Sequence, residues 1–254
     1  MSHLLNLVEK QVSMSNVRDR LKETPSRPGQ YVAEDGSIFG PCLLLSRECG
    51  SGGGLVARRV GELLGWNFFD DRIVDEIAQN ANVHQRLVQS VDERVHSRWE
   101  RIWREFLLDD LADEKYFRHL GQVVMALGHH GNVVIVGRGA QYFLPPQCAV
   151  RVRVVAPFAS RIKRLSEERK ICLAEARSQV EAIDKQRAAF IWKTFRKDIG
   201  SPLNTDITIN TGEIEIESAV KIVMAVLREK LGVSLNTQPG ICKEMTGHPA
   251  LKMN

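Results

Sequence analysis

The sequence predicts an α/β fold in which helices cover both faces of a five-stranded, parallel, doubly wound sheet. Two observations carry this prediction: strand-sized apolar runs recur along the chain, and segments with helical spacing of apolar residues separate them. The chain has 254 residues, of which 43% are hydrophobic and 26% charged, so it can bury a substantial core. This composition excludes a collagen, a coiled-coil rod and a wholly disordered chain.

Each predicted strand is a short run rich in apolar residues. In chain order the runs are CLLLS (42–46), NFF (67–69), NVVIV (132–136), VRVRVV (150–155) and DITIN (206–210). The run 132–136 is apolar at all but its first position, which is typical of a strand buried on both faces. Because helical segments separate the five runs, we expect them to pair in parallel.

The predicted helices show apolar residues on one face. In the first, 55–64, that face carries Val56, Val60, Leu63 and Leu64, and Gly65 ends the helix. The others cover a long stretch of about 72–129, then about 158–169, about 173–197 and 215–230. Three aromatic residues and one isoleucine at helical spacing within the long stretch are expected in the core: Trp99, Ile102, Trp103 and Phe106.

The chain is expected to divide into three parts. Residues 1–38 are polar and interrupted by Pro and Gly, which predicts a flexible extension with a possible helix over roughly 4–22. Residues 39–232 hold all the predicted strands and form one domain. Residues 233–254 carry Pro and Gly without a period and predict a flexible tail.

A glycine-rich segment, RECGSGGG (47–54), joins the first strand to the first helix. At this place backbone N–H groups and the positive end of the helix can bind phosphate. Against the phosphate-binding pattern G-x-x-x-x-G-K-[ST], Arg47 takes the first glycine, Gly53 the lysine and Gly54 the Ser/Thr position. The predicted nucleotide-binding residues are Arg47, Gly50, Ser51, Gly52, Gly53 and Gly54. A tight turn without a ligand is the alternative.

Residues of about 42–230 resemble the cytidylate-kinase-like proteins, a branch of the P-loop nucleoside monophosphate kinases. The matching segments keep their order and spacing: SRECGSGG (46–53), NFFDDRIVDEIA (67–78), VVIVGRGAQYFL (133–144), RVRVVAPFASRIKRL (151–165), IDKQRAAF (183–190) and DITINT (206–211). The resemblance implies a three-layer P-loop kinase fold with a helical lid at about 158–200. That family often shows GSGG in place of the lysine, but its next residue is commonly basic, and here it is Gly54.

Two carboxylates and one arginine follow predicted strands. Asp70 and Asp71 come after the second strand, where a carboxylate can hold Mg²⁺ or orient the attacking oxygen. The alternative is that one of them only caps the next helix. Arg138 lies in Gly-Arg-Gly, which resembles the Gly-Arg-Asp of cytidylate kinases and implies that it binds an acceptor phosphate. Gly139 replaces the Asp of that motif, and a surface turn is the alternative.

The formal net charge of the chain is +4, yet residues 151–199 hold 13 Lys and Arg against 6 Asp and Glu. The resemblance implies that lid arginines from this segment neutralise the transferring phosphate. The residues that follow the lid pattern of the family are Arg161, Arg164, Arg169, Asp184, Lys185 and Arg187. Of these, the candidate catalytic residues are Arg161, Arg164, Asp184 and Arg187. In that pattern the Asp side meets the nucleotide and the last Arg meets phosphate. Arg58 and Arg59 are alternative cations, but we expect them at the surface.

The main hypothesis is a kinase that uses ATP and Mg²⁺ to phosphorylate a nucleoside monophosphate, CMP or dCMP by resemblance. Two alternatives stay open. The absent lysine and hydroxyl, together with Gly139, favour a weak or inactive nucleotide-binding regulatory module. The third is a kinase for a small non-nucleotide acceptor, since the same fold serves such acceptors.

The expected partners are nucleotides, with no membrane and no nucleic acid. No apolar run reaches the ~18–20 residues of a membrane helix, and no nucleic-acid-binding motif accompanies the basic segment. The five Cys form no CxxC pair, and residues 1–10 do not read as a secretory signal, so we expect a reducing cytoplasm. The sequence leaves the oligomeric state open.

Overall fold

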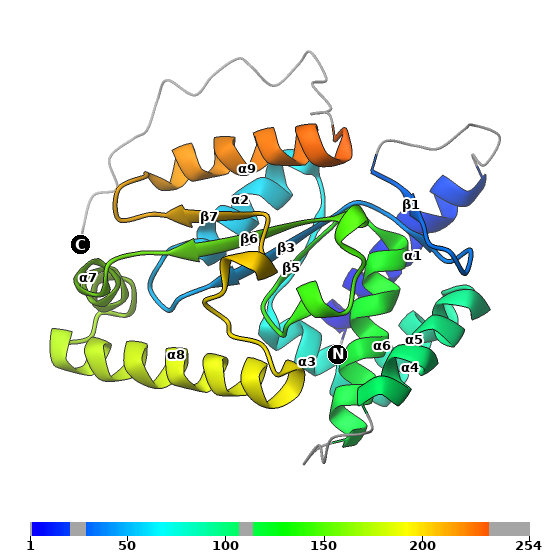
Figure 1. The fold of residues 1–254 in the computed structure, drawn as a ribbon, viewed down its shortest axis with the longest axis horizontal. Helices are drawn as coiled ribbons and strands as arrows, with labels where there is room; N and C mark the ends of the chain where they lie inside the picture. The colour runs from blue at the N-terminus through cyan, green and yellow to red at the C-terminus, as the bar shows by residue number, and fades with distance from the viewer. Residues whose placement is uncertain (1, 21–28, 107–113, 234–254) are drawn as a thin grey trace.

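The computed structural model describes residues 2–20, 29–106 and 114–233 (Figure 1). Its helices are α1 (Ser2–Arg20), α2 (Gly53–Leu64), α3 (Asp71–Gln79), α4 (Ala81–Gln89), α5 (Glu93–Phe106), α6 (Glu114–His130), α7 (Phe158–Arg169), α8 (Leu173–Phe195) and α9 (Ile216–Leu231). Its strands are β1 (Tyr31–Val32), β2 (Ile38–Phe39), β3 (Cys42–Arg47), β4 (Asn67–Phe69), β5 (Val133–Val136), β6 (Ala149–Val155) and β7 (Ile207–Asn210).

The predicted five-stranded parallel sheet is confirmed. Its strand order is β4-β5-β3-β6-β7, so the first predicted strand, β3, lies at the centre. Leu44 of β3 pairs with Ile135 of β5 on one side and with Arg151 of β6 on the other. The segments that follow β3 and β5 therefore lie side by side at the carboxyl end of the sheet, where ligands bind in open α/β folds.

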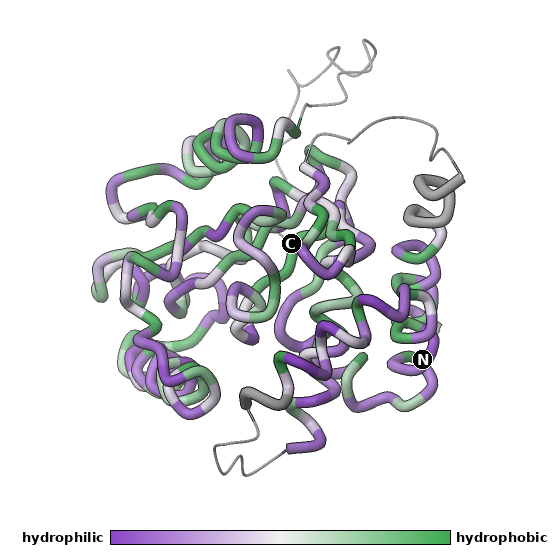
Figure 2. Tube along the Cα trace, turned by 45° about the vertical axis from the view of Figure 1, so that its right-hand side comes forward, coloured by the Kyte–Doolittle hydropathy of each residue, from purple (hydrophilic) through white to green (hydrophobic). Residues whose placement is uncertain are grey.

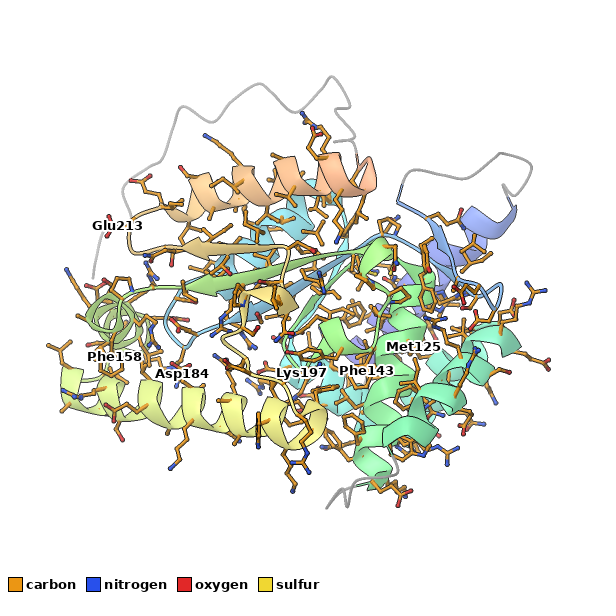
Figure 3. The ribbon with its side chains drawn as sticks, viewed as in Figure 1. Met125, Phe143, Phe158, Asp184, Lys197 and Glu213 are labelled. Atoms are coloured by element: carbon orange, nitrogen blue, oxygen red, sulfur yellow. The ribbon has the colours of Figure 1, made fainter. Side chains whose placement is uncertain are left out.

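Side chains along the central strand alternate between two cores. Leu43 and Leu45 pack with residues of α2 and α9, whereas Cys42 and Leu44 pack with residues of α3 and α6. Helices therefore cover both faces of the sheet, which gives the predicted three layers (Figure 1). Hydrophobic residues gather in the centre of the molecule in Figure 2, and the labelled Met125 and Phe143 of Figure 3 belong to the core beside α6.

The single long helical stretch expected over 72–129 was wrong in its continuity, because the structure divides it among α3, α4, α5 and α6. Asn80 separates the first two: its backbone N–H donates to Glu76 O, and its side chain accepts from Val83 N at 3.2 Å and caps α4. The aromatic residues expected in the core are buried at Trp99 and Trp103.

Residues 1–38, expected to be a flexible extension with a possible helix, contain a helix that packs on the domain. Helix α1 packs against α4 and α6, and its Val8 is buried. Gln11 donates from Nε2 to Gly131 O at 2.7 Å and accepts from Asn67 Nδ2 at 2.5 Å. An unpredicted antiparallel pair, β1 and β2, follows. Residues 21–28 and the predicted tail from 234 lie outside the described residues.

Among the helices described, none combines the length and the apolar character needed to cross a membrane.

Candidate functional site

The glycine-rich loop between β3 and α2 adopts a backbone that only glycine tolerates well. Gly50 and Gly52 have φ of 74° and 78°, in the left-handed region. A Cβ at Gly50 would overlap the carbonyl oxygen of Arg161, and one at Gly52 would lie 2.6 Å from Ile216 Cδ1. Gly52 is the N-cap of α2, so the first backbone N–H groups of the helix emerge from this loop and can bind an anion.

The position of the missing lysine is closed by packing. A Cβ at Gly53 would lie 2.7 Å from Cβ of Arg47 and 3.1 Å from Cβ of Val154. Gly54 differs, because nothing lies within 4 Å of a Cβ built there. The side chain of Arg47, at the end of β3, therefore occupies the space beside the first residue of α2.

Two neighbouring clefts open at the carboxyl end of the sheet. The first has a volume of about 320 Å³ and is lined by the glycine-rich loop, including Gly50, Gly52, Gly53 and Gly54. The second has a volume of about 1000 Å³ and contains Arg138 and Phe190. The residues common to both clefts are Arg47, Asp70, Asp71, Glu168, Arg169 and Arg187.

Arg47, Asp71 and Arg187 form the wall between the clefts. Arg47 Nη2 pairs with Asp71 Oδ2 at 2.9 Å, and Arg187 Nη1 donates to Arg47 O at 3.3 Å. Burial would raise the pKa of Asp71, but the charge and hydrogen bond of Arg47 outweigh it and lower that pKa. Burial, and then the charge of Arg47, lowers the pKa of Arg187. Both guanidinium groups stay charged at neutral pH.

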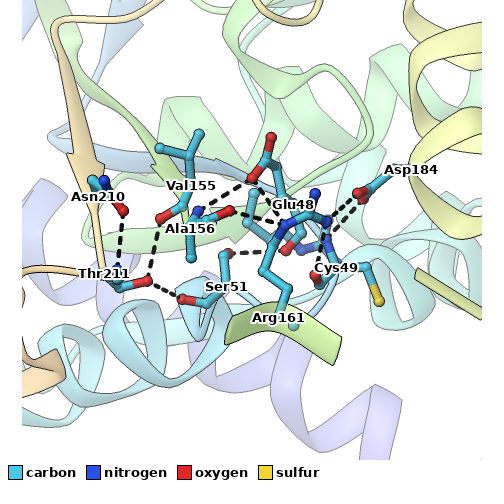
Figure 4. A network of polar contacts seen from close by, with 12 residues as sticks. Glu48, Cys49, Ser51, Val155, Ala156, Arg161, Asp184, Asn210 and Thr211 are labelled. Carbon is cyan, nitrogen blue, oxygen red and sulfur yellow. Dashed lines mark hydrogen bonds and ion pairs between the residues drawn. The ribbon is translucent and has the colours of Figure 1, made fainter. Parts of the chain in front are cut away.

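Arg161 is turned toward the loop backbone. The residue is only 8% exposed, and its Nη1 donates to Cys49 O at 3.2 Å. The same nitrogen pairs with Asp184, and Nε lies 3.3 Å from Glu48 Oε2. Asp184 in turn accepts the backbone N–H of Cys49 at 2.8 Å (Figure 4). Arg161 and Asp184 thus hold the loop in the structure, and their predicted contact with nucleotide stays a prediction.

Arg164 and Ser51 hold the other side of the loop. Arg164 donates from Nη1 to Gly50 O at 2.9 Å and from Nη2 to Thr211 O at 3.2 Å. Ser51 Oγ donates to Glu48 O at 2.9 Å, and its own carbonyl accepts from Thr211 Oγ1 at 2.5 Å (Figure 4). Ser51 is fully buried, so its hydroxyl shapes the loop.

Asp70 is the N-cap of α3, and its Oδ1 accepts from Ile73 N at 2.9 Å. The capping role considered for one of the two carboxylates therefore belongs to Asp70. The same residue lines both clefts, so one carboxylate group both starts the helix and borders the site. Among the alternative cations, Arg58 is exposed, borders the first cleft and lies with Cζ 4.5 Å from the ring centroid of Phe68.

Arg138 enters the second cleft from the turn after β5. It has φ of 52°, uncommon for a residue other than glycine, between Gly137 and Gly139, whose φ are 87° and 67°. A Cβ at Gly139 would overlap the ring of Phe195, which explains why a larger residue is absent there. Arg138 donates to Asp75 from Nε, at 2.7 Å, and from Nη2.

The sequence reasoning missed three residues that touch predicted site residues, Glu48, Asp75 and Phe190. It also missed Tyr116, which donates to Asp75. One signal was available for Asp75, because it follows Asp71 by four positions on a helix and so shares its face. Glu48 lies inside the glycine-rich segment itself. Tyr116 and Phe190 come from α6 and α8, and nothing in their local sequence indicates contact with the site.

Comparison with known proteins places the chain in a family. The model of the cytidylate kinase-like family matches residues 43–213. Curated cytidylate kinases from Saccharolobus islandicus strains L.S.2.15 and M.14.25 are each 24% identical over 202 residues, covering 78% of this chain and 94% of theirs. An uncharacterised protein from Eubacterium ventriosum has a crystal structure with a TM-score of 0.62 at 20% identity, over 74% of this chain and 98% of that one. The chain belongs to the cytidylate kinase-like family, whose characteristic chemistry is that of nucleotide kinases.

Proposed function

We propose that the protein transfers the γ-phosphoryl group of ATP to a nucleoside monophosphate. The observation that carries this proposal is the junction of the two clefts, where Arg47, Asp71 and Arg187 lie between the glycine-rich loop and Arg138. A donor in the first cleft and an acceptor in the second would meet at that wall. Phosphoryl transfer depends mainly on such positioning and on neutralising charge.

The first cleft fits the phosphates of ATP. Its backbone N–H groups at the start of α2 replace the hydration of phosphate oxygens, and Gly50 and Gly52 permit the required turn. Because packing closes the lysine position at Gly53, Arg47 and Arg187 supply the positive charge instead. Each guanidinium has several N–H donors, so each can neutralise one phosphate oxygen while keeping its present contact.

The metal proposal rests on Asp70. Within the described part of the chain there is no group of three or more His, Cys, Asp or Glu that could hold a metal ion. This fits Mg²⁺, which keeps several waters and binds through one or two carboxylates together with substrate phosphates. Asp70 would provide that carboxylate at the junction. When bound, Mg²⁺ neutralises charge that develops on the donor phosphates.

The acceptor would lie in the second cleft, with its phosphate at Arg138 and its base farther out. We propose CMP or dCMP because the curated relatives are cytidylate kinases. The amide side chains of Gln141 and Gln186 border this cleft and can both donate and accept hydrogen bonds, as recognition of cytosine requires. An oxygen of the acceptor phosphate then attacks the γ-phosphorus and forms a new P–O bond. The bond between the γ-phosphorus and the oxygen that bridges it to the β-phosphate breaks, and ADP leaves.

A steady-state assay tests the proposal directly. ADP formation is measured with Mg-ATP and a panel of nucleoside monophosphates, and product is identified as the matching diphosphate. We expect turnover to require an acceptor and to be fastest with CMP or dCMP. Turnover only with another nucleoside monophosphate would reject the assignment of CMP or dCMP as acceptor. No acceptor-dependent ADP would reject the kinase proposal.

One observation favours a second candidate, a nucleotide-binding module without turnover. The lysine position is closed at Gly53, and two predicted lid cations, Arg161 and Arg164, are engaged with loop carbonyls. Calorimetric titration with ATP separates the two candidates: tight nucleotide binding without phosphoryl transfer to any acceptor selects the module. Turnover with a sugar or hydroxy acid in the same assay would select the third, non-nucleotide acceptor class.

A further inference from the structure

Helix α3 presents two carboxylates to two arginines that follow neighbouring strands. Asp71 pairs with Arg47 at the end of β3, and Asp75, one turn later, pairs with Arg138 in the turn after β5. The side chains of Asp75 and Arg138 are 21% and 28% exposed, so water screens this pair only in part. Because Asp71 and Asp75 are one turn apart on α3 and β3 lies beside β5, both ion pairs can form at the same time.

The contact between Asp75 and Arg138 fixes one edge of the guanidinium. Arg138 donates from Nε and Nη2, so its side-facing edge is occupied by the carboxylate. The end-facing edge, formed by Nη1 and the second hydrogen of Nη2, keeps its donors for a ligand in the second cleft. Bidentate pairing of this kind fixes direction as well as position.

Two further side chains hold the pair in place. Tyr116 of α6 donates its hydroxyl to Asp75 Oδ1 at 2.7 Å, so the carboxylate itself is oriented. Phe190 of α8 covers a face of the guanidinium, with its ring centroid 5.6 Å from Arg138 Cζ. Burial alone would lower the pKa of Arg138, but the hydrogen bond of Asp75 and neighbouring negative charge raise it.

The backbone of Arg138 makes such support necessary. With φ of 52° it lies in a region that costs L-residues about 1–2 kcal/mol. The turn therefore aims the side chain by a strained backbone between two glycines, and a long side chain on such a turn keeps rotamer freedom unless something binds its end. Asp75 removes that freedom before an acceptor arrives, which lowers the entropy lost on binding.

We infer that Asp75 is a positioning residue for the acceptor phosphate, that it acts through Arg138, and that Tyr116 orients it. The inference rests on the proposed function, since it assigns Arg138 to the acceptor. Asp75 contributes no contact of its own to the acceptor, because its carboxylate would repel a phosphate. Its effect on the acceptor is therefore indirect and disappears when Arg138 is absent.

The test compares Asp75→Asn, Asp75→Ala and Tyr116→Phe with the wild-type chain. Asn keeps the size of Asp but cannot accept from both guanidinium nitrogens. We expect each Asp75 variant to weaken acceptor binding about 10-fold or more and Tyr116→Phe about 3-fold, with ATP affinity changed less than about 2-fold. Glu76→Gln is the matched control, because Glu76 is the next residue of α3, carries the same charge and is exposed.

A double-mutant cycle with Arg138→Ala decides whether Asp75 acts through Arg138. In the Arg138→Ala background we expect Asp75→Asn to weaken acceptor binding no further. A further loss in that background, or unchanged or tighter acceptor binding in Asp75→Asn alone, would each overturn the inference. Thermal denaturation of every variant separates these effects from general destabilisation, which would weaken ATP and acceptor binding together.

Calorimetry with CMP and with ATP gives the affinities, and ADP formation gives turnover. The two measurements distinguish a failure of the proposed function from a failure of the inference about Asp75. A wild-type chain that binds CMP but does not phosphorylate it rejects the proposed function while the binding cycle still tests Asp75. A wild-type chain that phosphorylates CMP, with Asp75→Asn indistinguishable from it, rejects only the inference. A wild-type chain that binds none of the nucleoside monophosphates rejects both.

Discussion

Two pairs of arginines beside the glycine-rich loop differ in what they contact. Arg161 and Arg164 of α7 donate to carbonyl oxygens of the loop, whereas Arg47 and Arg187 lie where the two clefts meet. Both sets surround a loop that lacks a lysine. The difference teaches that arginines of a basic segment can hold a loop through its backbone, because carbonyl oxygens also attract guanidinium groups.

The different contacts of the two pairs of arginines follow from the geometry of the loop. Backbone N–H groups can point to a phosphate only if the carbonyl groups of the same peptides point away from it. Those carbonyls of Cys49 and Gly50 then need donors, and Arg161 and Arg164 provide them. The N–H of Ser51 donates to Glu48 O, so the N–H groups at the start of α2 and the remaining arginines are left to the ligand. We therefore expect variants of the two sets to fail in different ways.

Arg187→Ala should give the largest change. An arginine that neutralises the transferring phosphoryl group accelerates P-loop enzymes by about 10³–10⁵-fold, so we expect kcat to fall by about 10³-fold. Stability should change little, because the substitution removes a single hydrogen bond, the one that Arg187 donates to Arg47 O. Arg177→Ala is the control, since Arg177 is an exposed arginine of the same helix. Equal kcat in the two variants would remove Arg187 from the reaction.

Arg161→Met should act mainly on stability. It removes the arginine partner of Asp184 and leaves Glu48 with Arg153 at 3.9 Å, at a site where Arg161 is 8% exposed. Removing one partner of a buried ion pair costs about 3–5 kcal/mol, so we expect the free energy of unfolding to fall by about 3 kcal/mol. Urea denaturation measures it. If the folded variant had a lower kcat but unchanged stability, Arg161 would belong with the cleft arginines.

Gly50→Ala should lower the free energy of unfolding, whereas Gly54→Ala should raise it. At Gly50 a Cβ overlaps Arg161 O and φ is 74°, so we expect a loss of about 1–3 kcal/mol in stability and weaker ATP binding. At Gly54 a Cβ meets nothing within 4 Å, and alanine favours a helix by about 0.5–1 kcal/mol. Denaturation and ATP titration of both variants check this pair. Similar behaviour of the two would contradict the loop geometry.

Asp35→Asn should change acceptor-dependent turnover least among these variants, because Asp35 lines neither cleft. Burial would raise its pKa, but hydrogen bonds from Ser37 and Arg98 lower it to about 2. A carboxyl group with a depressed pKa stabilises the fold above about pH 4 and loses that contribution as pH falls toward 2. The wild-type stability should therefore fall more steeply over this range than that of Asp35→Asn. Glu34→Gln, at an exposed neighbour, should follow the wild type.

The fold could be predicted because its signals are local. The alternation of Leu43 and Leu45 with Cys42 and Leu44, and the helical spacing after the loop, reflect the burial of each element. The break of the long helical stretch at Asn80 was harder, since asparagine is compatible with both a helix end and a helix start. The pair β1 and β2 has only two residues in each strand, too short for a periodic pattern.

The position of the candidate site could be predicted from the sequence, but the contacts between its side chains could not. Strand ends identified Arg47, Asp70 and Arg138, because parallel strands end at one edge of a sheet. Which arginines bind carbonyls, and which face a cleft, depends on how α7 and α8 pack on the loop. The contact of Tyr116 with Asp75 joins residues 41 positions apart, and no local pattern indicates it.

One measurement tests the central claim most directly: ADP formation with Mg-ATP, with and without CMP, by the wild type, Arg187→Ala and Arg177→Ala. The account predicts acceptor-dependent ADP formation in the wild type and in Arg177→Ala, and a rate about 10³-fold lower in Arg187→Ala. Acceptor-dependent turnover that is undiminished in Arg187→Ala would contradict the claim that charge at the cleft junction replaces the missing lysine.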